Sequence, residues 1–179
     1  MEPFVRRNHD GRESLGRPLG RQRMEILGIG TDIIECPRIG KMIEQHGELF
    51  LRRVYTEREI RYCQARKHAI EHFAGRWAAK EAILKAIGTG WNRGITWTDL
   101  EVRNGLGGEP KVHVCGGAKE AAIRRGIGDI LISISHCRTY ATAYAMAIGP
   151  GTSKRPAPAP NEPNPVPGAG PEAEPGDEG

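Results

Sequence analysis

Several hallmarks of common protein classes are missing from this sequence of 179 residues. No stretch approaches the run of about 20 apolar residues that a membrane-spanning helix needs, and the N-terminus lacks the apolar segment of a secretory signal. The four cysteines include no C-x-x-C pair. We therefore expect a cytoplasmic protein with reduced thiols and no membrane partner.

Both ends of the chain also lack a core-forming pattern. Residues 1–23 are rich in arginine and glycine, and residues 151–179 hold eight of the thirteen prolines among glycine, alanine and acidic residues. Segments of this composition bury too little apolar surface to offset the entropy lost on ordering. We predict a disordered basic extension over 1–23, one folded domain over 24–150, and a disordered, proline-rich acidic tail over 151–179.

The formal net charge is +4. This balance is typical of an ordinary basic surface, or of a protein with an anionic partner such as nucleic acid, a phosphorylated ligand or an acidic protein. A non-catalytic module that binds nucleic acid through residues 1–23 is one alternative. That segment lacks interleaved aromatic residues on which bases stack, so we expect no nucleic-acid partner.

The first half of the domain is predicted to be mainly helical. An apolar run at 25–34 predicts a strand. Pro37 suits the first turn of a short helix that Gly47 closes. Thr56, with Glu59 three residues on, forms a capping-box pattern that begins another helix.

The strongest helix is predicted at 68–87, where Ala, Leu, Glu and Lys dominate. At about 100° per residue, one apolar stripe carries Ile70, Phe73, Trp77, Leu84 and Ile87. Lys80 falls inside this stripe. The favoured interpretation is that its ammonium group reaches past the apolar surface into water; the alternative is a catalytic role.

The second half is predicted to consist mostly of strands. They lie at 99–104, 110–115, 129–136 and 139–148, with one helix at 117–125. Because helices come early and strands late, we predict an α+β fold, with a small antiparallel sheet packed against one long helix and several short ones.

Two carboxylates are candidates for chemistry. Asp32 ends the first strand, and Glu81 flanks the stripe of the long helix. Taken singly, Asp32 fits a helix cap and Glu81 an ion pair with Lys85 worth ~0.2–0.5 kcal/mol. Taken together, they fit Mg²⁺, which needs one or two protein carboxylates and completes its shell with water and phosphate oxygens. Spacing alone does not bring them together.

Four segments resemble one family: the strand GIGTDIIE, the helix core FAGRWAAKEAILKA, the following GTG and the late SISH. In order and separation they resemble the holo-acyl-carrier-protein synthases, the small homotrimeric phosphopantetheinyl transferases. The resemblance covers residues 25–149 and neither end. It implies transfer of 4'-phosphopantetheine from coenzyme A to a serine of an acyl carrier protein, with Mg²⁺ as cofactor, in support of fatty acid biosynthesis.

The resemblance implies a catalytic set of Asp32, Glu81 and Lys85. Asp32 and Glu81 match the metal ligands, and Lys85 matches a residue that contacts phosphate. The general base is either a carboxylate or a water ordered by the metal, and these alternatives stay open.

Further matches concern substrate binding. Arg76 and His136 match positions that line the nucleotide phosphates, and Gly88 and Gly90 fit the close approach of a phosphate or a ring, although Gly88 also fits a helix C-cap. On an ideal helix Arg76 and Lys85 point about 180° apart. They would serve different sites of a homotrimer with sites between subunits, or Arg76 would only stabilise the interface.

Acyl carrier proteins are acidic, and this family docks them on the region that follows the first strand. We predict that the carrier pairs with Arg38, Arg52, Arg53 and Arg58. Such charges at the edge of an interface act mainly on association rate and salt sensitivity. The alternative is an ordinary solvated face, because glutamates lie between these arginines.

A competing enzymatic interpretation is another Mg²⁺-dependent phosphoester-cleaving enzyme, such as a nuclease or nucleotide hydrolase. It would need a third acidic residue or an activating histidine near Asp32 and Glu81, and the sequence suggests none. Which carrier is modified, and whether acyl-coenzyme A is accepted, the sequence leaves open.

Overall fold

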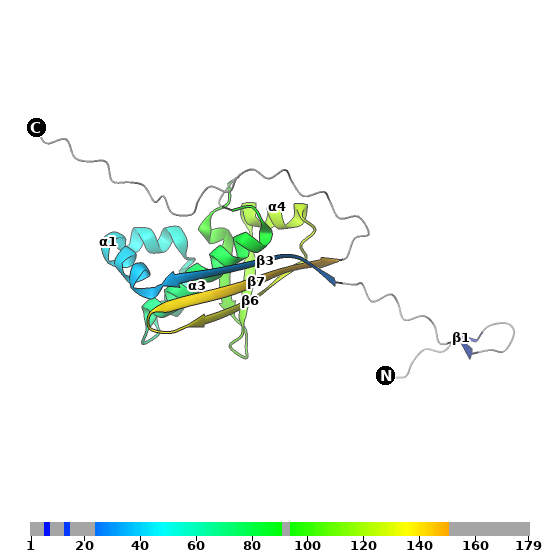
Figure 1. Ribbon diagram of the computed structural model, residues 1–179, viewed down its shortest axis with the longest axis horizontal. Helices are drawn as coiled ribbons and strands as arrows, with labels where there is room; N and C mark the ends of the chain where they lie inside the picture. Colours follow the sequence, from blue (N-terminus) through cyan, green and yellow to red (C-terminus); the bar gives the residue numbers. More distant parts are fainter. Residues whose placement is uncertain (1–5, 8–12, 15–23, 91–93, 151–179) are drawn as a thin grey trace, which may run out of the picture.

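The computed structural model describes residues 6–7, 13–14, 24–90 and 94–150 (Figure 1). In chain order its elements are β1 (Arg6–Arg7), β2 (Glu13–Ser14), β3 (Met24–Glu35), α1 (Cys36–Val54), α2 (Glu57–Gln64), α3 (Ala69–Ile87), the 3-10 helix η1 (Trp97–Asp99), β4 (Leu100–Asn104), β5 (Pro110–Val114), α4 (Gly116–Arg124), β6 (Asp129–His136) and β7 (Tyr140–Pro150).

The main sheet has three antiparallel strands in the order β3-β7-β6, and β4 and β5 form a separate antiparallel pair. The predicted α+β fold is confirmed. β1 and β2 pair with each other within the segment predicted to be disordered. The rest of residues 1–23 and all of 151–179 lie outside the described residues, so disorder of the two ends stays a prediction.

The long helix α3 lies against one face of the main sheet (Figure 1). Small residues allow a close approach. The side chains of Ala141, Ala143, Ala145 and Ala147 alternate along β7 and are buried. On β3, a Cβ added to Gly30 would lie only 2.0 Å from the main-chain oxygen of Ala82.

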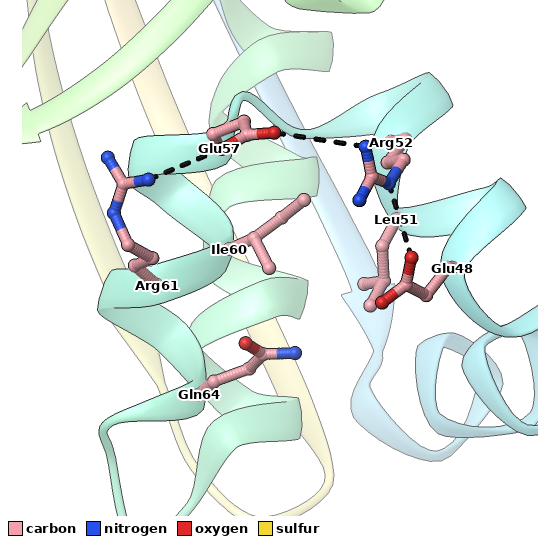
Figure 2. A pocket seen from close by; sticks show the side chains of 7 residues that line it. All are labelled: Glu48, Leu51, Arg52, Glu57, Ile60, Arg61 and Gln64. Carbon is pink, nitrogen blue, oxygen red and sulfur yellow. Dashed lines mark hydrogen bonds and ion pairs between the residues drawn. The ribbon is translucent and has the colours of Figure 1, made fainter.

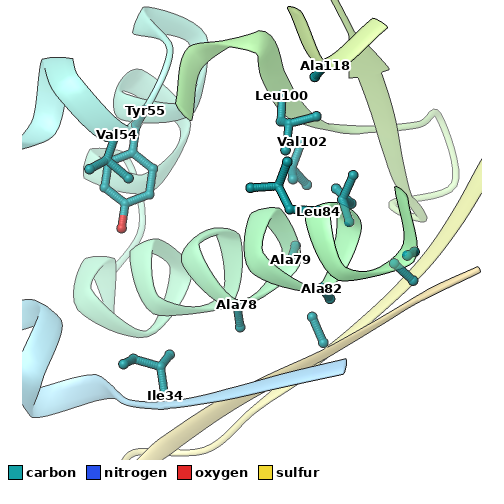
Figure 3. Packing of buried hydrophobic residues seen from close by; sticks show 14 of the residues in the cluster. Ile34, Val54, Tyr55, Ala78, Ala79, Ala82, Leu84, Leu100, Val102 and Ala118 are labelled. Carbon is teal, nitrogen blue, oxygen red and sulfur yellow. The ribbon is translucent and has the colours of Figure 1, made fainter. Parts of the chain in front are cut away.

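Helix α3 is buried on more than one side, so the single apolar stripe predicted for it is incomplete. Figure 3 shows Ala78 and Ala82 directed towards the strands, while Leu84 lies on the side of Leu100. Ile70, placed in the stripe, is 44% exposed. A helix enclosed between a sheet and other elements needs apolar residues all round, and alanines supply them next to the sheet.

The expectation that the ammonium group of Lys80 reaches water is wrong. Its side chain is fully buried and forms an ion pair with Glu59, which is also fully buried. Burial of a lysine requires partners for its charge, and the sequence did not show that Glu59 lies beside Lys80.

The start of α2 is as predicted, whereas the helix predicted to end at Gly47 continues beyond it. Thr56 and Glu59 form the capping box that begins α2. Gly47 interrupts α1 with φ 53° and ψ −132°. The chain then returns to helix up to Val54, so Gly47 marks a kink within α1.

The other face of the main sheet carries large apolar side chains that are more than half exposed: Ile26, Ile29, Ile33, Leu131 and Tyr144. They alternate with residues that face α3, because successive side chains of a strand point to opposite faces. Among the described helices, none combines the length and apolar character needed to span a membrane.

Candidate functional site

Asp32 lies where β3 crosses α3. Its carboxylate accepts a hydrogen bond from Lys85, with 2.8 Å between Lys85 Nζ and Asp32 Oδ1, and Lys85 Nζ also donates to the main-chain oxygen of Thr31 at 3.0 Å. The side chain of Asp32 is only 16% exposed. Helix α1 has Glu35, not Asp32, at its N-cap position. Asp32 is therefore not a helix cap.

Glu81 lies on α3 one turn before Lys85, on the same side of the helix. Its side chain is half-buried. The strand passes close to this part of the helix, since a Cβ on Gly30 would lie 2.9 Å from Lys85 Cβ. Asp32 and Lys85 therefore meet at the β3–α3 junction, and Glu81 lies one helical turn from Lys85.

The donor set of this junction fits magnesium. Among the described residues, no group of three or more His, Cys, Asp or Glu side chains is arranged to hold a metal ion. Zinc is usually held by three or four such ligands. Mg²⁺ needs only one or two carboxylates with water and substrate oxygens, which is what Asp32 and Glu81 can offer.

Arg76 and His136 lie together at a different place. Both line a pocket of about 150 Å³ between α2, α3, β4 and β6. Arg76 is 5% exposed, and its Nη2 donates to Asn104 Oδ1 at 2.9 Å. Its guanidinium group lies over the ring of Tyr62, 3.9 Å from the centroid. Within the described part of the chain, Arg76 Nε has no hydrogen-bond partner.

One histidine of this pocket, His72, lies on α3, and the other, His136, contacts residues of α3. His136 Nδ1 lies 3.4 Å from Glu71 Oε2, and the rings of His136 and His72 have centroids 5.1 Å apart. Burial, followed by the neighbouring charges of His136 and Arg76, lowers the pKa of His72. The guanidinium group of Arg76 and the carboxylate of Glu71 are thus among the charged groups beside the imidazole of His72.

Sequence reasoning did not assign the other three polar side chains of this pocket. His72 had a signal, because it precedes Arg76 by four residues and therefore shares its side of the helix. Tyr62 and Asn104 had none, since they come from α2 and β4 and join the pocket only through tertiary packing.

The two glycines predicted to bind substrate follow α3. Gly88 is its C-cap in the left-handed conformation, φ 74°, and its oxygen accepts from Arg125 Nη1 at 3.1 Å. Gly90 also has a positive φ, 56°. The C-cap interpretation of Gly88 is confirmed, and substrate binding by either glycine stays a prediction.

The arginines predicted to dock the carrier lie on the surface of α1 and α2. Arg38 and Arg53 are exposed. Arg52 lies between Glu48 and Glu57 (Figure 2): Arg52 Nε is 3.3 Å from Glu48 Oε2, and Arg52 Nη1 is 3.8 Å from Glu57 Oε1. Arg58 Nη1 lies 3.9 Å from Glu101 Oε1. The side chains of Arg52 and Arg58 are 65% and 64% exposed, and ion pairs of such exposed groups contribute little to stability, so these arginines can pair with another molecule.

The sequence matches the 4'-phosphopantetheinyl transferase superfamily over residues 28–148. The holo-[acyl-carrier-protein] synthase of Koribacter versatilis is 49% identical over 120 residues, which cover 66% of this chain and 94% of that protein. The synthase of Desulforudis audaxviator is 46% identical over 130 residues, covering 73% and 98%. A crystal structure of the Bacillus anthracis synthase in complex with CoA (3',5'-ADP) has a TM-score of 0.58 and 36% identity, covering 71% of this chain and 99% of that one.

The chain therefore belongs to the 4'-phosphopantetheinyl transferase superfamily, and within it to the holo-[acyl-carrier-protein] synthases. The resemblance to this family, which the sequence indicated over residues 25–149, is confirmed over residues 28–148.

Proposed function

We propose that this chain transfers 4'-phosphopantetheine from coenzyme A to a serine of an apo acyl carrier protein, with Mg²⁺ held by Asp32 and Glu81. Family membership supports the reaction. The single observation that carries the site is the bond between Lys85 and Asp32, because it joins β3 to α3 one helical turn from Glu81.

The serine oxygen forms a new bond to the phosphorus beside the pantetheine arm. The bond from that phosphorus to the bridging oxygen of the pyrophosphate breaks, and adenosine 3',5'-bisphosphate leaves with that oxygen. The serine proton passes to a carboxylate or to an ordered water. When bound, Mg²⁺ neutralises charge on the phosphates.

The residues of the junction divide the remaining work. Asp32 and Glu81 hold the metal. Lys85 neutralises Asp32 in the free protein, and its side chain is 46% exposed. The ammonium group can therefore turn from Asp32 to a phosphate oxygen of the substrate.

Arg76 and His136 bind the nucleotide phosphates of coenzyme A, as the buried Arg76 Nε, which has no hydrogen-bond partner among the described residues, suggests. They lie on another side of α3 from Lys85, so a single chain does not direct both groups at one ligand. We infer a homotrimer with sites between subunits. The exposed apolar face around Ile29 and Ile33 supports association, because monomers rarely leave such a patch uncovered.

Arg38, Arg52, Arg53 and Arg58 dock the acidic carrier. The holo carrier then serves fatty acid biosynthesis in the cytoplasm. The four cysteines are all free thiols, which supports a reducing compartment.

Intact-mass spectrometry tests the reaction. Apo carrier incubated with the protein, coenzyme A and magnesium should gain the mass of one phosphopantetheine. EDTA should abolish the gain and added magnesium restore it. Asp32→Asn and Glu81→Gln should each lose the activity, whereas Glu120→Gln, a well exposed carboxylate on α4, should keep it. No gain with the folded wild-type protein overturns the function, and full activity of Asp32→Asn overturns the metal site.

Subunit complementation tests the shared site. Asp32→Asn and Arg76→Ala should each be inactive alone. When the two variants are co-expressed, some interfaces combine an intact Asp32 side with an intact Arg76 side, so transfer should return in part. Mixed oligomers without any recovery would show that each site lies within one chain.

A further inference from the structure

The buried ion pair of Lys80 and Glu59 has no part in the reaction described above. Both side chains are fully buried, and Lys80 Nζ lies 2.8 Å from Glu59 Oε2. The ammonium group also donates to the main-chain oxygen of Val54 at 2.7 Å and to that of Trp97 at 3.0 Å. Its three N–H groups therefore match three acceptors.

The carboxylate of Glu59 is equally well satisfied. Oε1 accepts from the main-chain N–H of Val102 at 2.9 Å, and Oε2 accepts from that of Thr56 at 2.8 Å. Through these contacts one ion pair joins the last residue of α1, the start of α2, the middle of α3, η1 and β4.

Stability does not by itself account for such a pair. Removing two charges from water is costly, and burial lowers the pKa of Lys80 despite the opposing charge of Glu59. Well-packed apolar residues in place of a buried pair are often as stable or more stable. A fully satisfied polar network fixes the directions and distances between the segments it joins more strictly than apolar packing does.

The atoms that this network fixes adjoin the two halves of the proposed site. Val54 and Glu59 directly follow Arg53 and Arg58, which are proposed to dock the carrier. Lys80 directly precedes Glu81, which is proposed to bind the metal. The network therefore links the backbone next to the docking arginines with the helix residue next to Glu81.

We propose that Lys80 and Glu59 are positioning residues, which hold the carrier-docking surface at a set distance from the metal site so that the carrier serine meets the phosphorus. This inference rests on the proposed function. It predicts a characteristic defect: a carrier would still bind the exposed arginines, and coenzyme A would still bind its own residues, but the serine would be misplaced. A displacement of about 1 Å can cost about 100-fold in rate.

The experiment uses the paired variant Glu59→Gln/Lys80→Met in the full chain, which removes both charges at similar volume. Dissociation constants for coenzyme A and apo carrier are measured with single-turnover transfer at saturation. We expect both constants within about threefold of wild type and a transfer rate at least about tenfold lower. Ile87→Val, at the fully buried last residue of α3, controls for lost stability and should transfer at the wild-type rate.

The outcomes separate the two claims. If the wild-type protein transfers nothing, the proposed function fails. If it does transfer and the folded paired variant matches its rate, only the positioning role fails. If the paired variant does not fold, Glu59→Gln is used alone, because it keeps the volume of the side chain and one acceptor oxygen. A wild-type rate in this variant also overturns the inference. A reduced rate with unchanged dissociation constants supports it.

Discussion

Replacing Gly30 by alanine should damage catalysis by displacing the backbone, without removing a charged group. A Cβ at this position would lie 2.0 Å from the oxygen of Ala82 and 2.7 Å from the nitrogen of Ala86, whereas ordinary contacts begin near 3.4 Å. Strand β3 must therefore move away from α3 by more than 1 Å. Because Asp32 lies on this strand and Glu81 on the helix, the two carboxylates separate by a similar amount.

Two consequences follow for Gly30→Ala. Overpacking should lower the free energy of unfolding by about 1–3 kcal/mol. The misplacement should reduce the transfer rate by about 100-fold, since positioning errors of about 1 Å have effects of this size. The rate is measured by intact mass of the carrier at saturating substrates, and stability by thermal melting.

Gly128→Ala is the matched control. Its added Cβ would meet no atom closer than 3.8 Å, so this variant should keep wild-type stability and rate. A folded Gly30→Ala protein that transfers at the rate of Gly128→Ala would refute the claim that the β3–α3 approach sets the geometry of the metal site.

Three further predictions concern other parts of the molecule. Arg53→Glu should raise the KM for the carrier about tenfold and weaken the salt dependence of that KM, while the KM for coenzyme A stays unchanged. Arg124→Glu on α4 is the control and should change neither KM. Steady-state kinetics at two salt concentrations would contradict the docking assignment if the two variants behave alike. Burial lowers the pKa of His72 below the ordinary imidazole value of 6.5, so at lower pH the unfolded chain binds more protons than the folded chain and acid should destabilise the fold. Denaturant unfolding at pH 7 and pH 5 should show a lower free energy of unfolding at pH 5, and a smaller difference for His72→Phe. A thiol reagent should label Cys137 long before Cys63. The N–H groups of Tyr140 and Thr139 lower the pKa of Cys137, whereas burial raises the pKa of Cys63 to about 12. Peptide mapping after brief alkylation would contradict this order if Cys63 reacts first.

Local sequence signals predicted the local structure well. The capping box of Thr56 and Glu59 begins α2 because its two hydrogen bonds form within four residues. Gly88 ends α3 because only a residue that tolerates a positive φ can adopt the C-cap conformation there. The order of helices and strands then indicated the fold class.

The sequence by itself also determined which residue types were available at the site. Asp32, Glu81 and Lys85 were found as two carboxylates and a lysine on a strand and a helix, and the spacing of Glu81 and Lys85 placed them on one side of that helix. The angle between Arg76 and Lys85 likewise followed from helix geometry alone, and the structure gives these two residues different partners.

Only the tertiary structure decided which of these groups meet. Asp32 and Lys85 are 53 residues apart in the chain, and their contact depends on the close packing of β3 against α3. Lys80 was expected in water, but Glu59 and two main-chain oxygens surround it in the core. Periodicity reports which side of a helix a residue occupies, whereas the partners on that side come from other elements and are fixed only when the whole chain folds.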